Sequence, residues 1–266
     1  MATAKGKEEI NRASKALAGA GYRRASGGAA RRIIIALDGQ EKCGKTHFAL
    51  TAPAPIAVIS TDVGLDGVVQ KYQSDKEIWV AEFQVDMNEL KGLGVETAAK
   101  EARKTLAGIK KAYRDVLGEA KTIIWDTATE VWEIMRMAEF GKLDQVKPHH
   151  YGPVNSAYRS MLRMSYDNDY TNLVLLHKVK DEYVNDKTTG HKKRSGFSDT
   201  GFLVQVNGNC WKDRDPGIGV PDRFHMTITD CRHNPEAEGM DLSGEDCSFP
   251  VLASLVFPET SPKDWR

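Results

Sequence analysis

The stretch Gly39-Gln-Glu-Lys-Cys-Gly-Lys-Thr46 fits the pattern G-x-x-x-x-G-K-[ST] at every fixed position. The apolar run Ile33 to Leu37 precedes it and a helix-like stretch, Thr46 to Leu50, follows it. This strand, loop and helix order is the context that a phosphate-binding loop requires. Glycines in such a loop let backbone amides surround a phosphate, and the helix adds the positive end of its dipole. The stretch therefore predicts an α/β fold built around a phosphate-binding loop.

The loop also predicts a ligand and a metal. We expect ATP, with Lys45 reaching its β- and γ-phosphates and Thr46 coordinating Mg²⁺. The metal needs a carboxylate at the end of a neighbouring strand, and Asp126 ends the apolar run Thr122 to Trp125. Asp126 can also cap a helix starting near Ala128, and the two roles are compatible. The loop residues expected to surround the nucleotide are Gly39, Gln40, Glu41, Lys42, Cys43, Gly44, Lys45 and Thr46.

Hydrolysis requires a base that orients the attacking water, and two carboxylates compete for this role. Asp62 lies just after the apolar run Ile56 to Ser60, and Glu130 lies four residues beyond Asp126. We favour Asp62, because a side chain at a strand end is held more rigidly than one a turn into a helix. His177 ends another apolar run, so we expect it either to contact the nucleotide as a γ-phosphate sensor or to be a buried structural histidine.

Strand and helix signals alternate from Arg31 onward, which is typical of a parallel sheet with helices on both faces. Core strands are expected at residues 33–37, 56–60, 122–125 and 173–176. Helices are expected at residues 95–116, 128–140 and 154–166. Shorter strands are expected at residues 182–184, 201–207, 223–229 and 251–257. The predicted fold class is therefore α/β, with a mostly parallel central sheet flanked by helices and a strand-rich C-terminal extension.

The length of 266 residues fits one large domain. We expect a flexible basic N-terminal segment at residues 1–30, a core at 31–258 and a C-terminal tail at 259–266. The first segment is interpreted as a solvated tail, or as an arm for nucleic acid or a neighbouring subunit.

Composition narrows the functional class. Hydrophobic residues make up 41% and charged residues 28% of the chain, which argues against disorder and fibrous repeats. The formal net charge is zero, so any nucleic-acid binding must come from a local basic patch. Four cysteines without a C-x-x-C pair predict reduced thiols and no structural zinc. No apolar run approaches the roughly 20 residues that cross a bilayer, and a cytoplasmic protein without a membrane partner is expected.

These segments together resemble the RecA-like P-loop ATPases, and in particular a phage-encoded group of single-strand annealing or recombination ATPases. The stretch Ser60-Thr-Asp-Val-Gly-Leu-Asp66 is similar to the RecA segment that carries the catalytic acid, although RecA has glutamate where Asp62 stands. Thr122 to Glu130 resembles the Walker B strand of that family. Tyr151-Gly-Pro-Val-Asn155 resembles the start of the helix before its sensor strand, and Leu173 to His177 resembles the sensor strand. The resemblance runs from about Arg31 to Phe257.

The resemblance also implies sites for DNA and for a neighbouring subunit. The segment Asp181 to Gly201 stands where RecA-like recombinases place a DNA-contacting loop, and it is expected to be a mobile basic hairpin. Its alternative interpretation is a solvated hairpin without function. Arg232 matches the arginine finger that hexameric RecA-like helicases direct at a neighbour's ATP, although Asp230 replaces the companion lysine. The expected DNA-binding residues are Lys187, Lys192, Lys193 and Arg194.

Two functions from different classes follow. The first is an ATP-dependent protein that binds single-stranded DNA as a homo-oligomeric ring or filament and promotes annealing or strand exchange, with DNA-stimulated ATP hydrolysis. The second is a nucleotide-switched binding module that recruits a replication or recombination partner, such as a single-strand-binding protein, and turns over little ATP. The neutral net charge and the aspartate at position 62 favour the second function.

Overall fold

The computed structural model describes residues 15–21, 32–65, 67–185, 187–213 and 223–266. The chain divides into two units, residues 1–31 and 32–266. In the first unit, residues 15–19 are helical. Most of the predicted basic segment, residues 1–30, lies outside the described residues.

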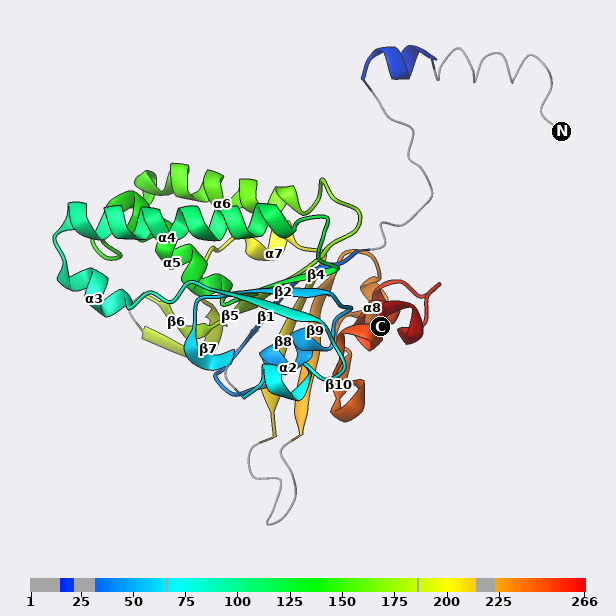
Figure 1. Cartoon of the computed structure of the whole chain (residues 1–266). Coiled ribbons are helices and arrows are strands. Elements are labelled where there is room, and N and C mark those ends of the chain that lie inside the picture. Colours follow the sequence, from blue (N-terminus) through cyan, green and yellow to red (C-terminus); the bar gives the residue numbers. More distant parts are fainter. Residues whose placement is uncertain (1–14, 22–31, 66, 186, 214–222) are drawn as a thin grey trace. The chain divides into compact units, whose positions relative to one another are not determined.

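An eight-stranded sheet forms the centre of this unit, in the order β10-β9-β8-β1-β5-β4-β2-β3 (Figure 1). The six strands from β8 to β3 run parallel, while β9 and β10 are antiparallel additions at one edge. The strand bounds are β1 Ile34–Gly39, β2 Ile56–Ser60, β3 Ile78–Glu82, β4 Thr122–Asp126, β5 Asn172–His177, β8 Val206–Lys212, β9 Phe224–Cys231 and β10 Asp241–Ser243. The predicted fold class, a mostly parallel sheet flanked by helices with added C-terminal strands, is confirmed.

Helices cover both faces of the sheet, because successive side chains of the buried strands alternate between two cores. Ile33, Ile35 and Leu37 pack with α2 and α8, whereas Ile34 and Ala36 pack with α4, α5 and α6 (Figure 1). The helix bounds are α2 Lys45–Leu50, α3 Met87–Gly92, α4 Val95–Val116, α5 Ala128–Phe140, α6 Gly152–Met164, α7 Thr200–Leu203 and α8 Phe249–Val256. Among the described residues, no helix combines the length and apolar character that crossing a bilayer requires.

A separate two-stranded antiparallel sheet follows β5. Its strands are β6, Val179–Val184, and β7, Lys187–Arg194. Lys180 pairs with Lys193, and Asp181 pairs with Lys192. The hairpin expected from the sequence is therefore present, although its first strand starts three residues earlier than expected.

Two of the strand predictions for the C-terminal third are wrong. Residues 251–256 belong to helix α8, whose buried residues Phe249, Leu252, Ala253 and Val256 follow helical rather than strand spacing. Pro250 stands in the first turn of this helix, where its missing amide hydrogen costs nothing. Residues 201–207 are likewise not one strand, since α7 occupies their first part and β8 begins at Val206. At the C-terminus, Trp265 is buried and its ring stacks on Phe257.

Candidate nucleotide site

The phosphate-binding loop leaves the C-terminal end of β1 and enters α2. A Cβ atom at Gly39 would approach the Cys210 carbonyl oxygen on β8 to 2.3 Å. Gly44 has a φ of +89°, and a Cβ atom there would lie 2.8 Å from the Phe224 ring. Both fixed glycines are therefore required by the packing around the loop. Lys42 also adopts a left-handed conformation, with a φ of 56°.

Lys45, the first residue of α2, turns its ammonium group back over the loop. Its Nζ atom donates to the carbonyl oxygens of Gly39, at 2.9 Å, and Gln40, at 2.6 Å. It also lies 3.6 Å from the Cys43 sulfur. The Lys45 ammonium group thus lies against the backbone of the loop, at the position where the sequence predicts a triphosphate.

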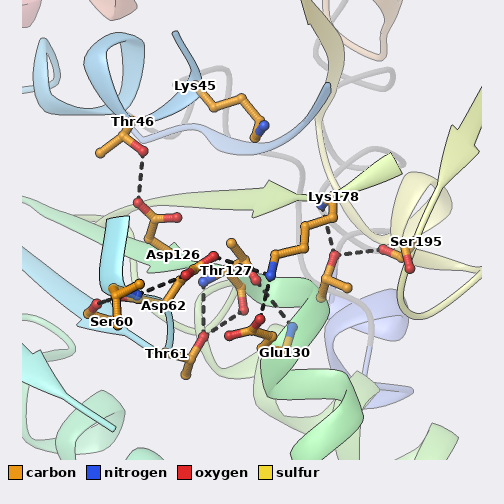
Figure 2. Close-up of polar contacts among 12 residues, drawn as sticks. Lys45, Thr46, Ser60, Thr61, Asp62, Asp126, Thr127, Glu130, Lys178 and Ser195 are labelled. Carbon is orange, nitrogen blue, oxygen red and sulfur yellow. Dashed lines mark hydrogen bonds and ion pairs between the residues drawn. The ribbon is translucent and has the colours of Figure 1, made fainter. Parts of the chain in front are cut away.

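Thr46 and Asp126 meet as the sequence predicts for a metal site. The Thr46 hydroxyl donates to Asp126 Oδ2 at 2.9 Å, across 80 residues of sequence (Figure 2). Burial raises the pKa of Asp126, while the hydrogen bond from Thr46 opposes this shift. Both atoms are hard oxygen donors, so the pair fits Mg²⁺. In the described part of the chain, no group of three or more His, Cys, Asp or Glu side chains suits a metal by itself, and a metal here would need phosphate or water oxygens as further ligands.

Asp126 is not the residue that caps the next helix. The N-cap of α5 is Thr127, whose side chain accepts a hydrogen bond from the Glu130 amide. Asp126 is therefore left to interact with Thr46 and the charges around it.

Lys178 is the residue that sequence reasoning missed. It directly follows β5, and its ammonium group forms ion pairs with Asp62, at 3.2 Å, and with Glu130 (Figure 2). Both candidate bases thus lie at the same edge of the sheet as Asp126, and they share one cation. Partial burial lowers the pKa of Lys178, but the pairing with Glu130 and Asp62 outweighs it and leaves the pKa raised. A cation at the end of a core strand was a signal that the sequence contained, since Lys178 follows the predicted strand and His177 directly.

Asp62 and Glu130 are held in different ways. Asp62 Oδ1 accepts a hydrogen bond from the Val63 amide at 2.8 Å, and the Asp62 side chain is 35% exposed. Glu130 lies in the first turn of α5, and its side chain is 20% exposed. The carboxylate of Asp62 is therefore both better fixed and more open to water.

Comparison with known protein families assigns the chain to a family. Residues 31–200 match the family described as AAA domain. The chain belongs to this AAA domain family. The matched region contains the phosphate-binding loop, both candidate bases, Lys178 and the β6–β7 hairpin. No curated protein matches the chain significantly.

Two solved structures are similar to this AAA domain chain. The flagellar accessory protein FlaH from Methanocaldococcus jannaschii is 11% identical, over 79% of this chain and 84% of that chain, with a TM-score of 0.43. The RadB recombinase is 14% identical, over 79% of this chain and 86% of that chain, with a TM-score of 0.46.

His177 lies inside the AAA domain rather than on its surface. Its side chain is fully buried, and Nδ1 lies 3.1 Å from the Ser195 carbonyl oxygen. Burial, with a smaller contribution from Arg194, lowers the pKa of His177 to about 3. The histidine is therefore neutral and structural here, and a direct contact between its ring and a phosphate is not open to it.

The base of the β6–β7 hairpin is fastened to the nucleotide site at both ends. At its start, the Lys178 amide donates to the Thr129 hydroxyl of α5, and the Thr129 hydroxyl donates to the Ser195 carbonyl oxygen. At its end, Arg194 Nε forms an ion pair with Asp38, at 3.0 Å, directly before the phosphate-binding loop. A cavity of about 420 Å³ is lined by the phosphate-binding loop, by β8 and by the hairpin, which contributes Lys192.

The structure separates the four basic residues expected to bind DNA. Lys187, Lys192 and Lys193 are exposed, and Lys192 forms an ion pair with Asp181. Arg194 is different: its side chain is only 17% exposed, and it also donates to Asn207. The expectation that Arg194 contacts DNA is wrong for this conformation, because its guanidinium is engaged inside the AAA domain.

Arg232 lies far from the loop of its own chain. It follows the end of β9, which runs antiparallel to β8, so that Cys231 lies beside Val206 at the start of β8. The phosphate-binding loop lies beside the other end, where Gly39 pairs with Cys210. Arg232 is exposed, and its guanidinium donates to the Phe202 carbonyl oxygen. It therefore cannot serve the nucleotide site of its own AAA domain.

Proposed function

We propose that the chain is an ATPase that binds single-stranded DNA as a homo-oligomer and promotes annealing or strand exchange, as the phage-encoded group that it resembles would. The observation that carries this proposal is the convergence of Lys45, Thr46 and Asp126 at one end of the sheet, beside a basic hairpin. The hairpin is fastened to the same site through Lys178 and Arg194. Membership of the AAA domain family supports the nucleotide part of the proposal.

The residues would divide the chemistry as follows. The loop amides and Lys45 bind the phosphates, while Thr46 and Asp126 hold the metal. Bound Mg²⁺ would supply charge neutralisation on the phosphate oxygens. Asp62 orients the attacking water, because its carboxylate is fixed by the Val63 amide and is open to solvent.

The hairpin would carry the DNA-binding part. Lys180 and Lys193 lie directly opposite each other on β6 and β7, and both are exposed. Like charges in such a pair repel, unless an anion neutralises them. A phosphate backbone is an anion that fits this pair, and Lys187 adds a third exposed cation on the same hairpin.

The experiment that tests the proposal measures ADP release by the purified protein with and without single-stranded oligonucleotide. We expect the rate to rise with the oligonucleotide, and Lys45→Ala to abolish it in both conditions. Lys100→Ala, the same change at an exposed lysine of α4, is the matched control and should retain most of the rate. A rate that does not respond to any polynucleotide would contradict the DNA-stimulated version.

A second function is favoured by one observation. Lys178 engages both candidate bases, and neither carboxylate is free in this state. Carboxylates paired in this way suit a nucleotide-switched module that recruits a partner, such as a single-strand-binding protein, and hydrolyses ATP slowly. Tight ATP binding with turnover near background, unaffected by DNA, would support this function over the first.

Arg232 would complete the site of a neighbouring copy. Its place at the opposite end of the sheet from the loop means that only another subunit can receive it. An arginine acting across a subunit boundary stabilises charge on the phosphoryl group during transfer. Self-association is thus part of the proposed function.

A further inference from the structure

The ammonium group of Lys178 interacts with three carboxylates at the nucleotide site. Its ammonium group contacts Asp62 and Glu130 at once, and it also acts electrostatically on Asp126 (Figure 2). One cation therefore offsets the repulsion of three carboxylates that converge on one edge of the sheet. A carboxylate paired in this way is a poor acceptor for a water proton, because the ion pair stabilises its charge and occupies its oxygens.

The main chain and the side chain of Lys178 have different freedom. Its amide donates to Thr129, and its carbonyl oxygen accepts from the Ser195 amide, so the backbone is fixed. The side chain is 45% exposed and carries a flexible four-carbon stem. Lys178 can therefore exchange partners without movement of β5 or of the hairpin.

The position of Lys178 indicates which new partner it would take. β5 lies directly beside β1, and His177 pairs with Asp38, the residue before the phosphate-binding loop. Lys178 thus follows the strand next to the one that carries the loop, on the side where Asp126 contacts Thr46. A triphosphate has one more charged group than a diphosphate, so a cation that reaches this group would bind the triphosphate more tightly.

We propose that Lys178 restrains Asp62 and Glu130 in the nucleotide-free protein and moves to the terminal phosphate of a bound nucleoside triphosphate, which releases a carboxylate to orient water. The inference rests on the proposed function, since it assumes a nucleotide at the loop. It makes Lys178 both a restraint on hydrolysis and the residue that distinguishes ATP from ADP.

The first test is calorimetric titration of Mg-ATP and Mg-ADP into wild type, Lys178→Met and Lys178→Arg. Loss of one charge-assisted contact should weaken ATP binding of Lys178→Met about tenfold and change ADP binding by less than about twofold. Lys178→Arg, which keeps the charge, should retain most of the preference for ATP. Lys100→Met, which removes an exposed lysine of α4, is the matched control and should behave as wild type. Equal weakening of ATP and ADP, or no weakening, would overturn the inference.

The second test addresses the restraint without any nucleotide. A double-mutant cycle of Lys178→Met and Asp62→Asn, followed by thermal unfolding, should show non-additive shifts in Tm, with Asp62→Asn less harmful when Lys178 is already replaced. Additive shifts would show that the two groups are independent and would contradict the proposed restraint of Asp62 by Lys178. This cycle also separates the two proposals: if wild type binds neither nucleotide, the proposed function fails, while coupling between Lys178 and Asp62 is still measured.

Discussion

Asp62 and Glu130 compete for one cation, but only Asp62 combines a fixed carboxylate with access to water. The Val63 amide fixes one of its oxygens, and the second oxygen faces Lys178. Glu130 contacts the same ammonium group from the first turn of α5, with less of its side chain exposed. The two carboxylates are therefore distinguishable by their kinetics, although they lie side by side.

Replacement of Asp62 should affect the chemical step. We expect Asp62→Asn to lower kcat about 100-fold or more with little change in KM, because general-base contributions are of this size. Glu130→Gln should lower kcat much less. Steady-state ATPase kinetics of the two variants check this, and the reverse order of effects would assign the water-orienting role to Glu130.

The buried His177 makes the folded state sensitive to acid. Its pKa is 6.5 in an unfolded reference and about 3 in the folded protein, so the unfolded chain binds the proton more readily. Burial of neutral His177 therefore stabilises the folded state fully above about pH 6.5, and this stabilisation is lost as the pH falls toward 3. Loss of this stabilisation should lower the free energy of unfolding by about 2 kcal/mol at pH 5 relative to pH 7. Urea unfolding of wild type and His177→Gln at both pH values measures this, and equal pH dependence in the two proteins would contradict it.

Local patterns predicted some site residues and missed others for a physical reason. Lys45 and Thr46 belong to one short motif and Asp126 ends a strand, so the sequence predicts that Thr46 and Asp126 lie together, and their side chains are in contact. The contact of Lys178 with Asp62 and the contact of Arg194 with Asp38 join residues far apart in the chain. Such contacts depend on which strands become neighbours in the sheet, which hydrophobic patterns do not specify. The same limitation explains why Arg194 was expected at a DNA surface.

At the scale of elements, the β6–β7 hairpin carries the proposed contact with DNA. Replacement of Lys187 and Lys193 by alanine should weaken binding to single-stranded oligonucleotides. It should also reduce the slope of log K against log salt concentration by about 1.4, since each single-strand phosphate contact contributes about 0.7. Fluorescence anisotropy over a range of salt concentrations measures both quantities.

The matched control for this prediction removes the same charge elsewhere. Lys100 and Lys104 are exposed on α4, and their double replacement by alanine should leave the salt slope unchanged. If both double variants lose the same slope, binding follows the overall charge and not the hairpin.

Some elements were predicted to the residue, and others were not. β2 and α5 have the bounds that the sequence predicts, because buried apolar runs and helical spacing are strong local signals. β3 was missed, since Trp79 and Val80 of this edge strand are exposed and give no buried apolar run. The sequence of α8 is almost entirely apolar, which hides the helical period and favours a strand, although Phe249, Leu252 and Val256 share one buried face of the helix.

At the scale of the whole molecule, the sheet separates Arg232 from the phosphate-binding loop. A mixing experiment tests whether one copy completes the site of another. Lys45→Ala and Arg232→Ala should each be inactive alone, yet their mixture should recover activity, because a loop from the second variant can meet an arginine from the first. Random assembly of equal amounts makes about a quarter of the interfaces productive. No recovery, in a mixture shown to co-assemble, would contradict a role for Arg232 across subunits.

If Arg232 serves the nucleotide site of a neighbouring copy, the opposite positions of the loop and Arg232 would give the assembly a direction. Contacts between unlike surfaces either close into a ring or continue without limit. In an open stack, the first copy offers a nucleotide site that no arginine reaches, and the last offers an arginine with no site to serve. Growth and loss of subunits would then differ at the two tips, and a capping partner could regulate length by recognising only one of them.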